Sequence, residues 1–295
     1  MVERFCAVLE DRGVLEVSGA DRYQFLQGLV SNDVAKATPD RALYAALLTA
    51  QGKYLHDFFI VAIGESLFLD GESARLADLK RRLGLYKLRA KVSLAEASER
   101  YIVAVAFGDG AATALGLPAE RGAAMPFADG VAYVDPRLAE LGARLLLPRG
   151  AGAAPLTGRG FRLSDVAGYD RLRLALGVPD GSRDLVLDKS ILLESGFDEL
   201  NGVDWQKGCY VGQELTARTK YRGLIKKRLM PVAIDGPLPP PGTPVMAGDQ
   251  EAGEMRSGRG GMGLALLRLE AVAEGKPLTA AGAKLTPQKP DWAKF

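Results

Sequence analysis

The last part of the chain, from about Ile225 to its end, limits the choice of fold more than any other segment. It carries short apolar runs separated by glycines and contains the proline cluster Pro237–Pro241, without a sustained helical periodicity. Proline interrupts helices and central strands, and short strands bounded by turn residues are typical of small β-proteins. The sequence therefore predicts a small all-β barrel or sandwich over residues 223–295.

The first 222 residues alternate between strand-like and helix-like segments, which indicates an α+β region. Apolar runs at Phe5–Glu10 and Val14–Ser18 flank a polar Asp-Arg-Gly turn, a pattern that predicts a β-hairpin. We expect a helix at Ser73–Leu83 that ends at Gly84, and a helix at Asp165–Leu176 that opens on an N-cap aspartate. Further strands are expected at Leu43–Thr49, Tyr54–Ile63 and Tyr101–Phe107.

Composition narrows the classes of function. Lys and Arg total 38 and Asp and Glu total 36, so the net charge of +2 argues against a wholesale nucleic-acid binder. The chain contains one His and two Cys, whereas an iron–sulfur cluster is usually held by four cysteines and a zinc site by a similar set. The sequence therefore predicts no metal site of the protein's own, and a hydrolytic triad would have to use His56.

The two cysteines, Cys6 and Cys209, lie far apart in the sequence, which makes a disulfide-stapled secreted fold improbable. The N-terminal residues are interrupted by charges every few positions and lack the apolar core of a signal peptide. No apolar run approaches the length of about 20 residues that spans a bilayer. We therefore expect a cytoplasmic protein with no membrane partner.

Cys209 stands in the most informative segment. It follows Lys207 and Gly208 and precedes Gly212, which opens the helix-forming stretch Gln213–Tyr221. A cysteine close to a helix N-terminus and to an ammonium group has a lowered thiol pKa, as reactive thiolates do. A small cysteine packed behind a turn would show the same local pattern, so both interpretations stay open.

A cationic run follows this segment, with no acid between Glu214 and Asp235. It could grip a polyanion such as a folate polyglutamate tail, an RNA or an acidic protein face. It could equally be a solvated helix end, where cations are favoured. The near-zero net charge makes nucleic acid the least favoured of these partners. The cations are Arg218, Lys220, Arg222, Lys226, Lys227 and Arg228.

The run Lys207–Arg218, which reads KGCYVGQELTAR, resembles the signature of the YgfZ-type folate-binding proteins. That family includes the mitochondrial iron–sulfur maturation factors of the CAF17 group. The stretch FLQGLVSNDV at Phe25–Val34 is similar to another element of the family. The stretch Leu193–Gly196, with Asn201 and Gly202 after it, is similar to a third. The resemblance therefore extends over most of the chain.

The wider superfamily includes the aminomethyltransferase, or T protein, of the glycine cleavage system. The resemblance implies two ferredoxin-like α+β domains within residues 1–222, whose segments can interleave along the chain, and a C-terminal β-barrel in residues 223–295. It further implies that the three domains form a ring around a hole that holds tetrahydrofolate.

The resemblance also assigns roles to single residues. Cys209 would be the functional thiol, with Lys207 as the neighbouring cation, and would contact a cluster transiently. Glu194 would anchor the pterin, since a carboxylate accepts two parallel hydrogen bonds from fork-like donors. The other cofactor-binding candidates are Asp57, Arg218 and Tyr210.

The implied function is a tetrahydrofolate-binding accessory protein for the assembly or repair of iron–sulfur clusters, with assembly factors or client proteins as partners. The alternative is a folate-dependent one-carbon transferase, and whether the protein is an enzyme stays open. The transferase carries a pair of acids where this chain has His56 and Asp57. Strand alternation would send these two side chains to opposite faces, so only one of them can line the hole, the acid as a folate contact or the histidine as a proton relay.

Overall fold

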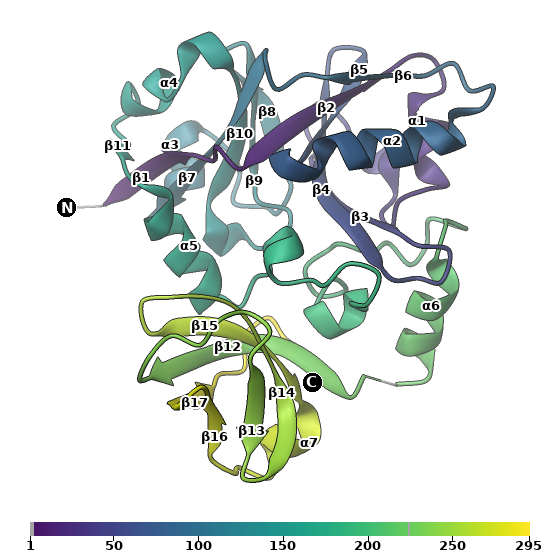
Figure 1. Cartoon of the computed structure of the whole chain (residues 1–295). Helices are drawn as coiled ribbons and strands as arrows, with labels where there is room; N and C mark the ends of the chain where they lie inside the picture. Colours follow the sequence, from purple (N-terminus) through teal and green to yellow (C-terminus); the bar gives the residue numbers. More distant parts are fainter. Residues whose placement is uncertain (1–2, 224) are drawn as a thin grey trace. The chain divides into compact units, whose positions relative to one another are not determined.

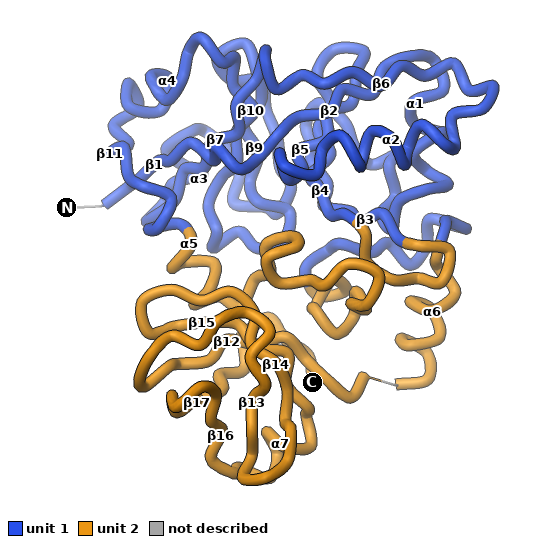
Figure 2. The backbone as a smooth tube through the Cα atoms, viewed as in Figure 1, with its two compact units in different colours: residues 1–48, 56–169, 200–211 blue, residues 49–55, 170–199, 212–295 orange. Residues whose placement is uncertain are grey.

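The computed structural model describes residues 3–223 and 225–295, and the chain divides into two units (Figures 1 and 2). Unit 1 contains Met1–Leu48, His56–Tyr169 and Leu200–Val211. Unit 2 contains Thr49–Leu55, Asp170–Glu199 and Gly212–Phe295. The chain thus passes between the units several times. Short 3-10 helices also occur, at Val34–Lys36 (η1), Ser73–Arg75 (η2), Ala139–Leu141 (η3), Arg149–Ala151 (η4), Gly181–Arg183 (η5) and Leu192–Ser195 (η6).

A six-stranded sheet forms one half of unit 1. Its pairs are antiparallel except for the parallel pair β1–β11. Alternate residues of these strands pack on the helices α3 (Ala111–Leu115) and α4 (Ala154–Thr157), and the buried Cys6 belongs to this core. The strand order is β11 (Arg162–Leu163), β1 (Arg4–Val8), β7 (Tyr101–Gly108), β10 (Ala143–Pro148), β9 (Gly130–Val134) and β8 (Ala124–Phe127).

A five-stranded sheet forms the other half of unit 1. The helix α2 (Leu76–Lys87) buries Leu76, Leu79 and Leu83. These residues recur at the spacing that places side chains on one helix face. The short helix α1 (Arg22–Gln27) follows the second strand of the chain. The strand order is β3 (Leu43–Leu48), β4 (Tyr54–Ile63), β5 (Ser66–Glu72), β2 (Arg12–Ser18) and β6 (Ser93–Glu96).

The predicted hairpin near the N-terminus is wrong. The strand β1 pairs with β7 and β11, whereas β2 pairs with β5 and β6, so the two strands belong to different sheets. The turn between them carries the chain from one sheet to the other, and Arg12 N donates to Leu9 O at 3.2 Å within it. Turn residues in a sequence predict that the chain changes direction, but they do not determine which strands pair with each other.

The expected end of the second helix is also wrong. The helix α2 continues through Gly84 to Lys87, and its C-cap is Leu88 at a φ of 39°. A glycine within a helix destabilises it by only about 1 kcal/mol relative to alanine, and packing of the buried leucines outweighs that loss. The helix expected at Asp165–Leu176 begins where it was predicted. Asp165 precedes its first residue, Val166, and Gly168 N donates to the Asp165 carboxylate at 3.3 Å, as expected of an N-cap.

A buried ionic cluster joins the two sheets of unit 1. Asp70 on β5 accepts from Arg12 Nε at 2.7 Å and from Arg144 Nη2 at 2.6 Å, and all three side chains are buried. Burial alone would raise the pKa of Asp70, but the two guanidinium groups outweigh it and hold that pKa below its usual range. The guanidinium of Arg144 also lies 4.0 Å from the ring centre of Phe59. Two buried guanidinium groups of the core therefore share the single carboxylate of Asp70.

The C-terminal part of unit 2 is a closed six-stranded barrel, which confirms the predicted β module. Its core contains buried aliphatic residues such as Val232, Met255 and Leu267. The barrel closes because β12 pairs with both β15 and β17. The strand order is β12 (Lys227–Asp235), β15 (Met262–Arg268), β14 (Gln250–Arg259), β13 (Pro244–Ala247), β16 (Leu278–Ala280) and β17 (Ala283–Pro287), and α7 (Leu269–Ala273) follows β15.

Within unit 2, a second buried ionic cluster fixes residues 170–175, the second half of the helix α5 (Val166–Ala175), to the barrel. Arg173 donates to Asp170 Oδ1, Asp184 Oδ2 and Ser257 Oγ, each at 2.7 Å. Asp184 in turn accepts from the backbone N–H of Ser257 at 3.0 Å. The α+β region and the barrel together confirm the expected fold class.

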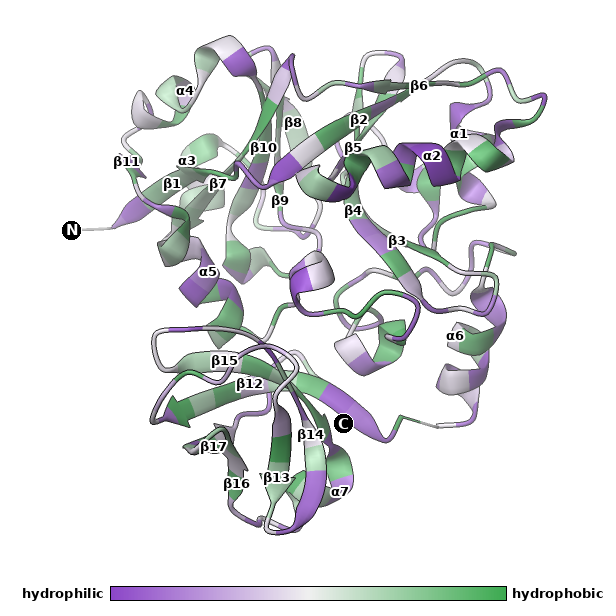
Figure 3. Ribbon diagram, in the orientation of Figure 1, coloured by the Kyte–Doolittle hydropathy of each residue, from purple (hydrophilic) through white to green (hydrophobic). Residues whose placement is uncertain are grey.

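Figure 3 shows that the strands carry most of the hydrophobic residues, whereas α2 and α6 (Gln213–Tyr221) include hydrophilic turns. Among the described residues, the helices are all too short or too polar to cross a membrane. The ring and its central hole stay a prediction from the family resemblance.

Candidate functional site around Cys209

Cys209 lies exposed on the loop 207–211 of unit 1, which we name the cysteine loop. Gly208 and Gly212, on either side of the cysteine, have φ values of 88° and 80°. Residues with a Cβ rarely adopt this left-handed conformation, so the loop requires glycine at both positions. The glycines of the motif therefore shape the loop that presents the thiol to solvent.

Lys207 fastens the cysteine loop to the end of α1. Its Nζ donates to Gln27 O at 2.6 Å and to Val30 O at 2.5 Å. Carbonyls at a helix C-terminus lack partners within the helix, and an ammonium group suits them in both hydrogen bonding and charge. Burial lowers the pKa of Lys207 to about 8, although Asp33 and Asp204 oppose the shift. The ammonium also lies 4.9 Å from the ring centre of Tyr210, which is itself buried.

Gln27 completes this connection. Its Nε2 donates to Asp33 Oδ1 at 2.9 Å and lies 3.4 Å from Lys207 O, and its Oε1 accepts from Val34 N at 2.8 Å. The backbone adds a further bond, from Val211 N to Gly28 O at 3.1 Å. The cysteine loop is therefore held at both ends by the turn that follows α1.

The next residues of the N-terminal motif bind the segment that precedes the cysteine loop. Ser31 Oγ donates to Gly202 O at 2.5 Å, and Asn32 Nδ2 donates to Asn201 O at 2.7 Å. Asp204 N donates to Ser31 O at 3.0 Å. The three stretches of sequence that resemble family elements are therefore joined by hydrogen bonds around the cysteine loop. Sequence reasoning found those stretches but missed that Gln27, Ser31 and Asn32 support the cysteine loop.

We expect Lys207→Met to loosen this loop. The substitution keeps much of the aliphatic length but removes two charge-assisted hydrogen bonds, a loss of about 2–4 kcal/mol in local stability. Hydrogen exchange at residues 207–211 should therefore accelerate, while exchange in β7 and in the barrel stays slow. Lys189→Met, at an exposed lysine of unit 2, is the matched control. Unchanged exchange in the loop would contradict the assigned clamp.

His56 and Asp57 lie on opposite faces of β4, as strand alternation requires. His56 Nε2 lies 3.0 Å from Asp78 Oδ2 of α2, and Asp57 Oδ2 accepts from the Tyr44 hydroxyl at 2.8 Å. Both side chains are buried. Burial and the nearby Arg75 lower the pKa of His56 to about 4, so the imidazole is neutral at pH 7. That pKa is poorly matched to proton relay near neutral pH.

Glu194 lies in unit 2 on η6 and is half-buried. Burial raises its pKa, although the cations Lys227, Lys53, Arg228 and Arg256 act in the opposite direction. Within the described residues its carboxylate makes no hydrogen bond. A half-buried carboxylate of this kind fits the paired N–H donors of a pterin ring.

Arg228 is a supporting residue that the sequence alone did not distinguish from the other cations of its run. It is buried, donates to Leu193 O at 2.9 Å, and pairs with Glu199 at 2.8 Å. It therefore fixes the turn that carries Glu194. In the same run, Arg218 is exposed and pairs with Glu214 along α6.

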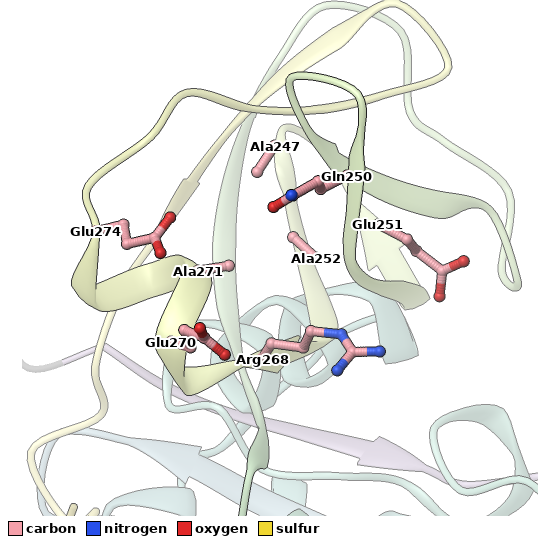
Figure 4. A pocket seen from close by; sticks show the side chains of 8 residues that line it. All are labelled: Ala247, Gln250, Glu251, Ala252, Arg268, Glu270, Ala271 and Glu274. Atoms are coloured by element: carbon pink, nitrogen blue, oxygen red, sulfur yellow. The ribbon is translucent and has the colours of Figure 1, made fainter.

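The structure contains a hollow in unit 1 and another in the barrel. The hollow in unit 1 has a volume of about 500 Å³ and borders Asn32 and Asn201, with Lys36 paired to Asp204 at its wall. The hollow in the barrel measures about 260 Å³ and is lined by alanines, Gln250, Arg268 and three glutamates (Figure 4). Among the described residues, His, Cys, Asp and Glu side chains do not gather in a group of three that could hold a metal ion.

Comparison with curated proteins decides the family. The chain is 36% identical over 309 residues to the human protein named iron–sulfur cluster assembly factor IBA57, mitochondrial, and the match covers 97% of this chain and 85% of that protein. The chain belongs to the IBA57 family of iron–sulfur cluster assembly factors. The mouse protein of the same name is 35% identical over 312 residues, with the same two coverages.

Membership of the IBA57 family agrees with two further comparisons. Residues 226–295 match the model of the CAF17 C-terminal β-barrel domain, which coincides with the barrel of unit 2. The crystal structure of the glycine cleavage system aminomethyltransferase T from Bartonella henselae covers 99% of this chain at a TM-score of 0.80 and 16% identity, with 87% of that chain matched. At that identity the likeness shows a shared fold only. The resemblance to CAF17-type maturation factors is confirmed.

The expectation of a cytoplasmic location is contradicted by the same comparison. The IBA57 proteins of human, mouse and Neurospora crassa are all named as mitochondrial. The expectation rested on the composition of the N-terminal residues and on cysteine scarcity. Cysteine scarcity fits any reducing compartment, so it could not distinguish the cytoplasm from an organelle.

Proposed function

We propose that this IBA57-family protein binds tetrahydrofolate, or a derivative of it, and uses the Cys209 thiol to assemble or repair iron–sulfur clusters on partner proteins. The observation that carries the proposal is the exposed Cys209 on a loop that Lys207 and Gln27 hold in place. A thiol with a defined position and open access suits transient ligation or exchange.

The cysteine inventory supports a role in handing over clusters. Cys6 is fully buried in the core of unit 1, which leaves Cys209 as the accessible thiol of the chain. A cluster that contacts Cys209 needs further ligands, since such clusters usually take four thiolates. In this proposal the partner supplies them, and the cluster is cargo, not a resident cofactor.

Folate binding is supported by the state of Glu194. Its carboxylate is half-buried, makes no hydrogen bond within the described residues, and is carried by a turn that Arg228 fixes. The resemblance to folate-binding proteins implies the other folate contacts of this proposal, from Asp57, Tyr210 and Arg218. Bound folate would supply a reduced pterin, whereas the protein would supply orientation and burial.

The proposed function is tested by deleting the gene in its host and measuring the activity of iron–sulfur enzymes against enzymes that lack clusters. The proposal expects a loss confined to the cluster enzymes, restored by the wild-type gene. The shared fold with an aminomethyltransferase favours one alternative, a one-carbon transferase. That alternative expects turnover of a methylene- or formyl-folate that Asp57→Asn abolishes, and equal activity of both enzyme groups would favour it.

Folate binding has its own test. Isothermal titration of the purified protein with tetrahydrofolate should show binding that Glu194→Gln weakens by at least about tenfold, because the amide replaces one acceptor with a donor. Glu251→Gln, an exposed glutamate of the barrel, should leave the affinity unchanged. Equal affinities of wild type and Glu194→Gln would remove Glu194 from the site.

A further inference from the structure

We propose that residues 84–89, at the end of α2, form a docking surface for the partner protein that meets Cys209. The inference rests on the proposed function and names the chemistry of its partner. That partner presents an apolar pocket with an acidic rim. We call residues 84–89 the α2 tip.

The α2 tip exposes large apolar side chains in close succession. Leu85 is 67% exposed, Tyr86 is 44% exposed and Leu88 is 89% exposed. Single exposed apolar residues are ordinary on protein surfaces, but a contiguous group marks an interaction site. Leu83, just before the tip, is fully buried, so the helix changes from a packed face to an open one at Gly84.

The backbone of Leu88 adds a second observation. Its φ of 39° and ψ of −109° lie outside the regions that residues with a Cβ ordinarily adopt. A conformation of this kind destabilises a protein by about 1–3 kcal/mol, and such strain clusters at functional sites. Glycine would avoid the strain, yet the chain carries a leucine whose side chain is almost fully exposed. Burial of Leu88 in a partner would offset this loss.

Charge indicates the chemistry of the partner. Residues 80–91 contain six cations and no acid. Three of the six have acidic partners nearby, because Lys80 approaches Glu96 and both Arg81 and Arg82 pair with Asp78. No acidic side chain of the described residues pairs with Lys87 or Arg89, which flank the exposed Leu88. The complementary surface is therefore acidic around an apolar centre.

Lys91, two positions beyond the α2 tip, and the cysteine loop contact opposite ends of α1. Lys91 N donates to Asp21 Oδ2 at 2.7 Å, and Asp21 is the N-cap of α1. The cysteine loop is attached to the other end, through Gln27 and Gly28. Six helical residues span about 9 Å. A protein interface of ordinary size, roughly 800 Å² on each side, can therefore cover both features.

An anionic membrane would also attract cations and apolar side chains. Each cation near an anionic surface contributes only about 1 kcal/mol, and stable attachment takes more apolar burial than three side chains provide. A partner that exchanges a cluster at Cys209 is a protein, and α1 connects the segment after the α2 tip with the cysteine loop. We therefore assign the surface to a protein.

The test uses the full-length protein in its host cells and two cross-linking probes. One is p-benzoylphenylalanine placed at Leu88, and the other is a thiol-directed cross-linker that reacts at Cys209. We expect both probes to capture the same protein, and the double variant K87E/R89E to reduce the Cys209 cross-link about tenfold. The variant K189E/K284E, with the same change of charge on unit 2, should not reduce it.

Further measurements separate docking from misfolding. Leu88→Gly relieves the backbone strain, so it should raise the urea concentration at the midpoint of unfolding while weakening the Cys209 cross-link. The reactivity of Cys209 toward a small disulfide reagent should be the same in every variant. A different protein captured at Leu88, or an undiminished Cys209 cross-link in K87E/R89E, overturns the proposal. So does sedimentation of the wild type, but not K87E/R89E, with vesicles of phosphatidylcholine and phosphatidylserine.

The docking proposal and the proposed function fail differently. If Cys209→Ser still supports the cluster enzymes, the proposed function fails. The α2 tip then has no role in cluster exchange at Cys209. If Cys209→Ser loses that support while K87E/R89E retains both the support and the cross-link, only the docking proposal fails.

Discussion

Replacing Asp70 by asparagine is expected to lower the free energy of unfolding by about 3–5 kcal/mol. The carboxylate compensates Arg12 and Arg144, and both guanidinium groups are buried with it between the two sheets of unit 1. Asparagine has nearly the same volume but no charge, so it removes the carboxylate with which both buried guanidinium groups pair. The loss therefore comes from uncompensated charge, since no cavity is created.

Urea unfolding monitored by circular dichroism would measure this effect. Asp235→Asn, at an exposed aspartate of the barrel, should change the free energy of unfolding by less than about 0.5 kcal/mol. Replacing all three cluster residues with apolar side chains of similar volume should restore much of the stability that Asp70→Asn loses. A loss below about 1 kcal/mol in Asp70→Asn would show that the cluster is not compensated in the way described.

The same cluster sets the response to acid. The pKa of Asp70 is lowered in the folded protein relative to the unfolded chain, so the unfolded chain binds the proton first as the pH falls. The stabilisation is therefore fully present above the ordinary aspartate pKa and is lost as the pH falls through the lowered value. Asp204 behaves in the same direction, because Lys36 holds its pKa down. Unfolding free energies measured from pH 6 downward should fall less steeply in Asp70→Asn than in the wild type.

The second large effect concerns the thiol. Cys209→Ser is expected to abolish the support of iron–sulfur enzymes in the deletion strain, because a hydroxyl is neither a comparable nucleophile nor a ligand for a cluster. The exposed position of Cys209 means that the substitution should leave the unfolding free energy unchanged within about 0.5 kcal/mol. Folate affinity should also be retained.

Cys6→Ala provides the matched comparison. Cys6 is fully buried in the six-stranded half of unit 1, so its replacement should destabilise the fold by about 1 kcal/mol while the protein continues to support cluster enzymes. Replacing Cys6 would then lower stability but not function, whereas replacing Cys209 would abolish function but not stability. Full activity of Cys209→Ser would remove the thiol from the mechanism.

Local pattern was sufficient for most elements. The helix-forming stretch Gln213–Tyr221 coincides with α6, and the segment after Ile225 forms the barrel. These segments were predictable because helix and strand periodicities, caps and proline positions act within a few residues. The first hairpin was not, because β1 and β2 find their partners about a hundred and about sixty residues away, respectively.

The sequence by itself determined the α+β and barrel composition, the family, and the presence of a cysteine between glycines that must adopt left-handed backbone. Only the tertiary structure decided what the neighbours of that cysteine do. The ammonium of Lys207 binds carbonyls that lie 180 and 177 positions earlier in the chain. Hydrogen bonds of that separation depend on how the whole unit packs, and spacing along the chain does not encode them.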